Sequence, residues 1–347
     1  MIKIRTAICA SLATVLFFSV SSCTPKEVEV KDTPPNLTTL PDDISSLKIY
    51  KGATKDLIPN SWYTDFEGAT DLFTDSCEKQ DLIYIPEGKK IIPPAVGSGL
   101  PTFPSGTIFL KTFYYYNDKR NPALGKKIIE TRVILFADGK WDGKTYAWND
   151  DQTNAYSVKQ GKGYDVSYID KEGKNHQFRF NITKQGQCML CHIDYSTGSF
   201  MPIGFKMKFI NTNRIEAPFI NQISYFQQIG KMEQTDPTRF ISVAKKYDLD
   251  QPLEKRVRGY LAANCAYCHN PSGSAWNPPA LTLNLDYEVP LDSTGITDKK
   301  DGIDRRDSIV SRMLSKDVKK WMPKVHSTLI DYQQIELIKQ YFATLDK

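Results

Sequence analysis

The sequence has few histidines, few basic clusters and no tandem repeats, and each absence narrows its function. Only four of its 347 residues are histidine, and no run of Lys and Arg is longer than two. The net charge of +5, which falls by two if Lys3 and Arg5 are removed, is too weak a bias to predict nucleic-acid binding. No internal repeat occurs beyond one short motif, so repeat architectures are excluded.

The composition is otherwise that of a globular chain. The sequence is 24% charged and 40% hydrophobic, with 20 glycines and 20 prolines, which excludes collagen-like and wholly disordered chains. Its length allows about two domains of roughly 100–200 residues each. Aromatic residues make up 12% of the chain, which favours a β-rich region or an apolar cofactor pocket.

The N-terminal residues 1–22 are predicted to be a signal peptide. Lys3 and Arg5 precede an apolar run, Thr6–Val20, which is shorter than the about 20 residues of a membrane-spanning helix. The run is followed by Ser21-Ser22-Cys23, which resembles a bacterial lipobox. That resemblance implies cleavage before Cys23 and lipidation of its thiol and amino group. An ordinary cleaved signal with an incidental cysteine is the alternative.

Lipidation would anchor the protein to a membrane of the cell envelope, with the protein facing the periplasm or the cell surface. Several acyl chains on one residue give stable anchoring where a single chain is marginal. Residues 23–44 contain four prolines and almost no aromatic residues, so they are predicted to form an extended tether.

The remaining chain predicts an α+β fold, with an antiparallel β-rich domain at 45–214 and an all-α domain at 215–347. Turns such as Asp138-Gly139 and Glu172-Gly173 separate segments rich in Ile, Val, Tyr and Phe. The expected strands are 82–85, 107–116, 128–136, 164–169 and 176–182. Helical periodicity appears at 215–234, 253–265 and 331–345, with a charged loop expected at 297–307.

Two segments carry the pattern Cys-x-x-Cys-His, the attachment signature of c-type haem. They are Cys188-Met-Leu-Cys191-His192 and Cys265-Ala-Tyr-Cys268-His269. Two cysteines three residues apart can form thioethers to the two vinyl groups of one porphyrin, and the adjoining histidine can bind the iron. The sequence therefore predicts two covalently bound c-type haems, with His192 and His269 as iron ligands.

Other kinds of cysteine-based site fit the sequence less well. A zinc site could use all four motif cysteines, but the two pairs lie much farther apart than the about 15–20 residues of compact zinc modules. A thioredoxin-like redox pair would not place histidine after both copies. Of the three cysteines outside the motifs, Cys9 leaves with the signal peptide, Cys23 is lipidated, and Cys77 is predicted to be a small buried apolar residue.

The second axial ligands are less sharply defined by the sequence. Met322, in Met322-Pro323, is the predicted ligand of the His269 haem, with His326 as the rival and packing in the core as the alternative. Met201 is the first choice for the His192 haem, and an open distal position is the alternative. Two further candidates for this haem are Met207 and His176.

The chain resembles a largely uncharacterised bacterial family of dihaem c-type cytochromes, over about residues 72–345. The stretches that carry the resemblance include Leu72-Phe-Thr-Asp75, Phe103–Phe113, Tyr146–Thr153 and both haem motifs. Ordinary cytochrome c domains are similar to the last third, where a helix ends in the motif, a Met-Pro loop follows, and a C-terminal helix crosses the first. The first half also has a weaker likeness to cytochrome P-460, in which haem packs against a sheet and some members carry a lysine cross-link. That likeness points to Lys111, which otherwise is expected to face solvent.

These observations favour an anchored electron-transfer protein that exchanges electrons with redox partner proteins, with no catalytic residues of its own. The alternative is an oxidoreductase in which an open haem at His192 acts on peroxide or a nitrogen oxide. A third hypothesis is a surface binding module in which the β-rich domain holds a polymer or a partner and haem is secondary.

Overall fold

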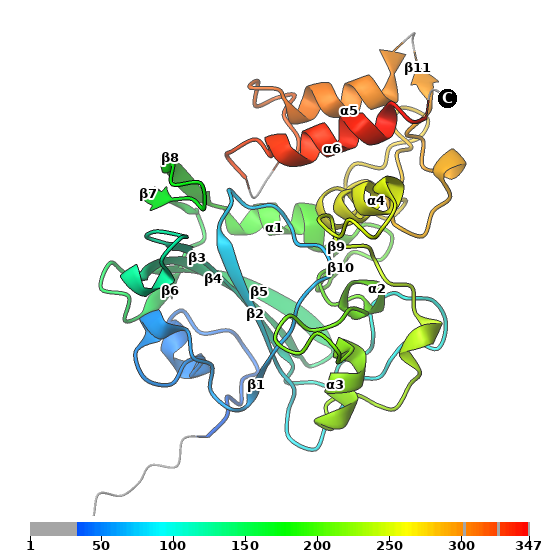
Figure 1. Cartoon of the computed structure of the whole chain (residues 1–347). Helices are drawn as coiled ribbons and strands as arrows, with labels where there is room; N and C mark the ends of the chain where they lie inside the picture. The colour runs from blue at the N-terminus through cyan, green and yellow to red at the C-terminus, as the bar shows by residue number, and fades with distance from the viewer. Residues whose placement is uncertain (1–32, 301–302, 325–326, 346–347) are drawn as a thin grey trace, which may run out of the picture. The chain divides into compact units, whose positions relative to one another are not determined.

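The computed structural model describes residues 33–300, 303–324 and 327–345. From Pro34 onward the chain is one compact unit, in which an antiparallel sheet from the first half is joined by helices that come mainly from the second half (Figure 1). The predicted α+β class is confirmed at this level. The predicted signal peptide and Cys23 lie outside the described residues. Within the described ranges, no helix combines the length and hydropathy of a membrane span.

The main sheet is a six-stranded antiparallel meander in which the strands follow chain order. Its β4–β5 hairpin turns at Asp138 and Gly139, whose φ angles of 51° and 73° suit the tight turn predicted there. The strands are β1 (Tyr63–Asp65), β2 (Glu78–Tyr84), β3 (Ile108–Tyr116), β4 (Lys126–Ala137), β5 (Lys140–Trp148) and β6 (Ala155–Ser157).

Both faces of this sheet are buried, because apolar side chains alternate between them along each strand. On β2, for example, Leu82 packs into one hydrophobic cluster and Ile83 into the other. The first cluster is covered by the chain around Ile44 and Leu47, and the second by segments that follow the sheet, including Phe205 and Phe226. A second hairpin, β7 (Lys162–Ile169) with β8 (Asn175–Ile182), packs against β3 and β4.

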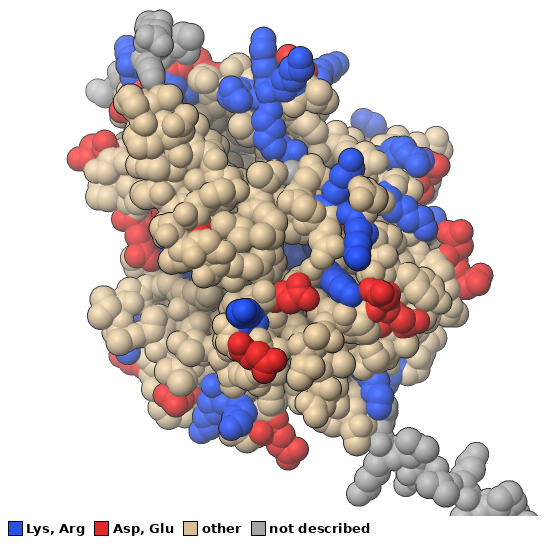
Figure 2. All heavy atoms as spheres, turned by 180° about the vertical axis from the view of Figure 1, so that it is seen from behind, with Lys and Arg blue, Asp and Glu red and all other residues tan. Residues whose placement is uncertain are grey.

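The helices and short ribbons complete the fold. Two ribbons each pair two residues: β9 (Ile193–Asp194) with β10 (Ser199–Phe200), and β11 (Lys299–Lys300) with β12 (Ile303–Asp304). The helices are α1 (Gln185–His192), α2 (Met207–Ile210), α3 (Gln222–Gln228), α4 (Leu253–Asn264), α5 (Arg305–Met313) and α6 (Tyr332–Phe342). Helices α4, α5 and α6 share one hydrophobic cluster. Figure 2 shows charged side chains of both signs on the face seen from behind, with Lys and Arg gathered at its upper end.

All five predicted strands are present, as β2, β3, β4, β7 and β8, and so are the helices at α4 and α6. The predicted helix at 215–234 is wrong over most of its length, because Asn221 caps a helix that starts only at Gln222 and Gly230 follows its end with φ 72°. Phe219, assigned to the apolar face of that helix, is 97% exposed. The charged loop predicted at 297–307 instead ends in α5, whose first turn is capped by Asp304.

Two predicted segment boundaries, the end of the tether and the division at 214/215, differ from the boundaries in the structure. The end of the predicted tether packs on the sheet: Leu40 is buried, and the Pro41 carbonyl accepts a hydrogen bond from Tyr146 at 2.6 Å. The sheet's second hydrophobic cluster continues to Phe240. The predicted division at 214/215 therefore falls inside this core, and the helical cluster begins at α4.

Candidate functional site

The two motifs are presented by the ends of two helices. Cys188, Cys191 and His192 lie on α1, which ends because Ile193 is extended and starts β9. Cys265 is the residue that caps the C-terminus of α4, and the chain continues in one more turn, in which the N–H of His269 donates to the Cys265 carbonyl at 2.9 Å. Each motif thus winds its two cysteines and its histidine around a single turn.

Both motifs line one cavity of about 310 Å³. That volume falls within the range of about 300–1,000 Å³ that is typical of small-molecule sites. All four cysteines and both histidines contribute to its wall, and so does Met322. Residues predicted from three separate parts of the sequence to serve haem are therefore brought together.

The His192 imidazole is held in one orientation. Its Nδ1 lies 2.8 Å from the Met201 carbonyl oxygen, and its ring stacks on Phe200 with the centroids 5.1 Å apart. Because a carbonyl can only accept, Nδ1 carries the proton, and Nε2 keeps its lone pair for a metal. Burial lowers the pKa of His192 to about 4, so the ring is neutral at pH 7.

The His269 imidazole is buried with an unsatisfied nitrogen. Its Nδ1 has no hydrogen-bond partner among the described residues. Burial lowers its pKa to about 4, and the nearby Arg312 and Arg305 add to that shift. A buried polar atom without a partner is uncommon in a folded protein and marks a place where a bound group is expected. The residues present thus fit a haem at both motifs.

Cys77 is buried, as the sequence predicted, whereas Cys9 and Cys23 lie outside the described residues. The four motif cysteines are free thiols, and Cys77 is a buried member of the β7–β8 cluster, where burial raises the pKa of its thiol to about 12. Cys191 and Cys268 lie in hydrogen-bonding contact, which lowers the pKa of the Cys268 thiol and raises that of Cys191. Within the described ranges, no group of three or more His, Cys, Asp or Glu is arranged as metal ligands.

The two methionines predicted as second axial ligands lie at different cavities. Met322 lines the same cavity as His269, and its N–H donates to the Arg312 carbonyl at 3.0 Å. Met201 contacts His192 through its main-chain carbonyl, and it lines a neighbouring cavity of about 610 Å³ rather than the cavity shared by the two motifs.

The remaining candidate ligands are elsewhere. Met207 is fully buried in the sheet core, and His176 pairs with Asp170 at 2.6 Å in the β7–β8 hairpin. The rival ligand His326 lies outside the described residues.

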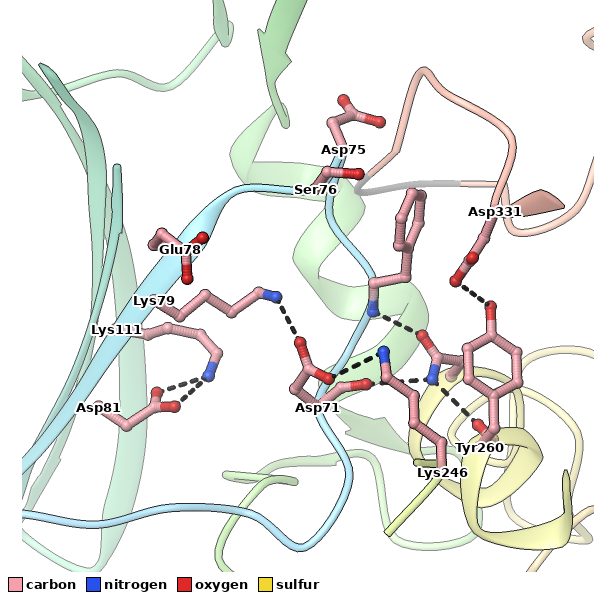
Figure 3. Close-up of polar contacts among 12 residues, drawn as sticks. Asp71, Asp75, Ser76, Glu78, Lys79, Asp81, Lys111, Lys246, Tyr260 and Asp331 are labelled. Atoms are coloured by element: carbon pink, nitrogen blue, oxygen red, sulfur yellow. Dashed lines mark hydrogen bonds and ion pairs between the residues drawn. The ribbon is translucent and has the colours of Figure 1, made fainter. Parts of the chain in front are cut away.

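A polar network joins the segment before β2 to the helix that carries the second motif (Figure 3). Asn264, the residue before Cys265, accepts a hydrogen bond from the Phe73 N–H at 2.7 Å and donates to the Asp71 carbonyl at 3.2 Å. The Asp71 carboxylate pairs with Lys79 at 2.8 Å and with Lys246 at 3.2 Å. Burial raises the pKa of Asp71, but the two lysines outweigh burial and hold it below its usual range. The network fixes the start of the second motif against the sheet half.

A second anchor holds the loop that carries Met322. The Asp75 carboxylate accepts hydrogen bonds from the main-chain N–H groups of Thr328 and Leu329 at 2.7 Å each, and from the Ser327 and Thr328 hydroxyls at 2.8 Å each. Asp75 is 1% exposed and belongs to the same segment before β2 (Figure 3). No local pattern in the sequence indicates these contacts, because they join residues far apart along the chain.

Lys111 does not simply face solvent, as the strand pattern predicted. Its Nζ lies 2.5 Å from both carboxylate oxygens of Asp81, and the pair lines a separate cavity of about 160 Å³ (Figure 3). His192 and Arg132 also line this cavity. The lysine points inward because β2 and β3 present this face to the segments that follow α1.

Gly273 is a sensitive position next to the second motif. A Cβ there would lie 2.2 Å from the Cys268 carbonyl oxygen, whereas a Cβ at Gly186 on α1 would meet no heavy atom within 4 Å. We expect Gly273→Ala to lower the free energy of unfolding by about 1–3 kcal/mol or more. The control Gly186→Ala should raise it by up to about 1 kcal/mol. Denaturant unfolding of both variants measures this, and equal stabilities would contradict the close packing at Gly273.

Comparisons with protein-family models, with curated proteins and with solved structures find no match for the chain. The candidate site is therefore defined by its own residues: two haem-attachment motifs on one cavity, two partly buried, neutral histidines, and a wall that includes Met313 and Met322.

Proposed function

We propose that the protein is an exported, lipid-anchored dihaem c-type cytochrome that transfers electrons between redox partner proteins. The observation that carries the proposal is the single cavity lined by both Cys-x-x-Cys-His motifs and by Met322. Bound haem would supply one-electron redox chemistry. The chain would hold one haem through Cys188, Cys191 and His192, and the other through Cys265, Cys268 and His269.

The chain's own residues would set the properties of each centre. The Met201 carbonyl orients His192 and raises the basicity of its Nε2. Met322 would serve as the second ligand at the His269 site, which favours a higher potential than bis-histidine ligation. Both imidazoles are partly buried at the cavity wall, and burial lowers the pKa of each to about 4, so each stays neutral at pH 7 and available to a metal.

The last third of the chain is proposed to be a cytochrome c-like all-α domain, in keeping with the resemblance to dihaem cytochromes. Three features support this. Helix α4 leads into the second motif, α6 packs against α4 in one cluster, and the Met322-Pro323 loop lies between α5 and α6.

The proposed partners are redox proteins and, through the lipid anchor at Cys23, the membrane; nucleic acid is not proposed. The protein would lie in the cell envelope, facing the periplasm or the cell surface. The surface next to Met322 is positively charged, which favours an acidic partner. Its exposed lysines are Lys316, Lys319, Lys320 and Lys324.

Export of the full chain together with a haem-attachment system tests the proposal. The mature protein should carry two covalent haems, and the paired variants Cys188→Ala/Cys191→Ala and Cys265→Ala/Cys268→Ala should carry one each by mass. Unfolded wild type should present a single reactive thiol, that of Cys77, which the folded protein protects because burial raises its pKa to about 12. An exported protein without covalent haem would contradict the proposal.

A second candidate function is catalysis at an open His192 haem, and the cavity of about 160 Å³ favours it. The cavity combines apolar walls, including Phe66 and Phe205, with the Lys111–Asp81 ion pair and His192. A small pocket with a few convergent polar groups suits a molecule such as peroxide or a nitrogen oxide.

Carbon monoxide binding to the reduced holoprotein separates this candidate from a simple carrier. A catalytic site predicts binding at one haem only, with an affinity changed several-fold by Lys111→Met. The control Lys144→Met removes a lysine that lies two strands away on the other face of the sheet, where it pairs with Asp42 at 2.7 Å, and should leave binding unchanged. If neither haem binds carbon monoxide, the catalytic candidate is excluded.

A further inference from the structure

The two motifs meet at one main-chain carbonyl. Leu190 lies between the two cysteines of the first motif, and its carbonyl oxygen accepts a hydrogen bond from the Cys268 Sγ at 3.3 Å. The same oxygen accepts a second bond from the Ser274 hydroxyl at 2.9 Å. The second cysteine of one motif therefore lies beside the second cysteine of the other.

Contacts around this carbonyl hold the junction in place. The Tyr195 N–H donates to the Ser272 carbonyl at 2.9 Å, which ties the chain after His192 to the loop after His269. Tyr267, between the two cysteines of the second motif, lines each of the three cavities around His192 and Met201. Gly273 brings the loop so close to Cys268 that no side chain fits there.

We infer that the two haems are carried edge to edge, joined through the neighbouring thioethers of Cys191 and Cys268, and act as one coupled redox pair. The inference rests on the proposed function. A thioether places each sulfur directly on the edge of its porphyrin. Because Cys191 and Cys268 lie in hydrogen-bonding contact beside the Leu190 carbonyl, their thioethers would bring the two porphyrin edges together. An electron gained by one haem then changes the reduction equilibrium of the other, because the two charges are close together and poorly screened.

Once haem is attached, the Ser274 hydroxyl becomes the main hydrogen-bond donor to the Leu190 carbonyl, where the two motifs meet. A cysteine that forms a thioether loses its S–H, so Cys268 no longer donates to the Leu190 carbonyl. The Ser274 hydroxyl is unaffected by that reaction and remains as donor. Ser274 is accordingly a positioning residue that keeps the two haem edges in register, with no part in the redox chemistry itself.

The test uses the full-length holoprotein and the two single-haem variants described above. A coupled pair predicts a bisignate Soret circular dichroism signal and an EPR spectrum that differ from the sum of the two single-haem spectra. It also predicts that reducing one haem changes the reduction equilibrium of the other at least tenfold, which is 59 mV for one electron.

Ser274→Ala should reduce the Soret couplet while both haems remain attached. The control Ser311→Ala removes a hydroxyl that likewise donates to a main-chain carbonyl, at 3.1 Å on α5, and should leave the couplet intact. Spectra that equal the sum of the single-haem variants would overturn the inference but leave the dihaem function standing. Absence of covalent haem would instead overturn the function itself.

Discussion

Met322→Ala is expected to lower the reduction potential of one haem by on the order of 0.1 V or more and to leave the other nearly unchanged. A thioether ligand raises the potential of haem, and axial ligands set haem potentials over a range of about 0.8 V. Met322 shares the cavity wall with His269, as does Met313, which packs in the hydrophobic cluster of α4, α5 and α6. Its loss should also remove the methionine–iron charge-transfer band and make one ferric haem high-spin.

A potentiometric titration with optical detection measures both effects. Met201→Ala is the matched control, because Met201 lines a different cavity while its carbonyl, which holds His192, is kept. If Met201→Ala lowered a potential and Met322→Ala did not, the ligand assignments would be reversed. If neither did, the axial ligand would have to come from elsewhere, and His326→Ala would be the next variant.

The haem prediction could be made from the sequence because covalent attachment requires a fixed spacing of residues. The sequence places two cysteines and a histidine on one turn, and this pattern has one common purpose whatever the surrounding fold. The structure adds that α1 and α4 bring His192 and His269 to one cavity. That meeting depends on packing between distant segments, which no local pattern reports.

Strands were predicted better than helices in this chain, and the reason is visible at α3. The period of apolar residues over 215–234 looked helical, but only Ile223 and Phe226 of α3 are buried with the sheet, while Phe219 before it is exposed. A short helix such as α3 needs only one buried apolar turn. The apolar residues in the loops on either side of it match the helical period by coincidence. By contrast, β7 alternates between exposed and buried positions along most of its length, as a predicted strand should, and the Asp138-Gly139 turn marks the β4–β5 hairpin even though β5 was not among the predicted strands.

The parts of the site that the sequence missed are carried by main-chain groups and by single polar residues. The Leu190 carbonyl is invisible in a sequence, since every residue has one. Asp71 and Asp75 look like ordinary acidic residues in a segment without regular structure, yet one anchors the helix of the second motif and the other its methionine loop. Such contacts connect positions that are close only after folding.

Asp75→Asn is expected to destabilise the protein by about 2–4 kcal/mol and to loosen the loop that carries Met322. The carboxylate accepts four hydrogen bonds from residues 327–329, and bonds to a charged group contribute roughly 1.5–3 kcal/mol each, without being additive. An amide has a single acceptor oxygen, so buried donors lose partners. Asn is the better substitution than Ala because Asp75 has φ 47°, a region that Asn tolerates.

Asp138→Asn provides the matched control, since Asp138 also has a positive φ, 51°, but lies at the β4–β5 turn away from the cavity. It should change the free energy of unfolding by no more than about 0.5 kcal/mol. A positioning role for Asp75 further predicts that its Asn variant shares the spectral change of Met322→Ala, with both haems still attached. Loss of stability with the methionine–iron band intact would show that Asp75 holds the two halves together without controlling the ligand. The β-rich half would then support the second haem's attachment, and the methionine would depend on contacts within the helical part alone.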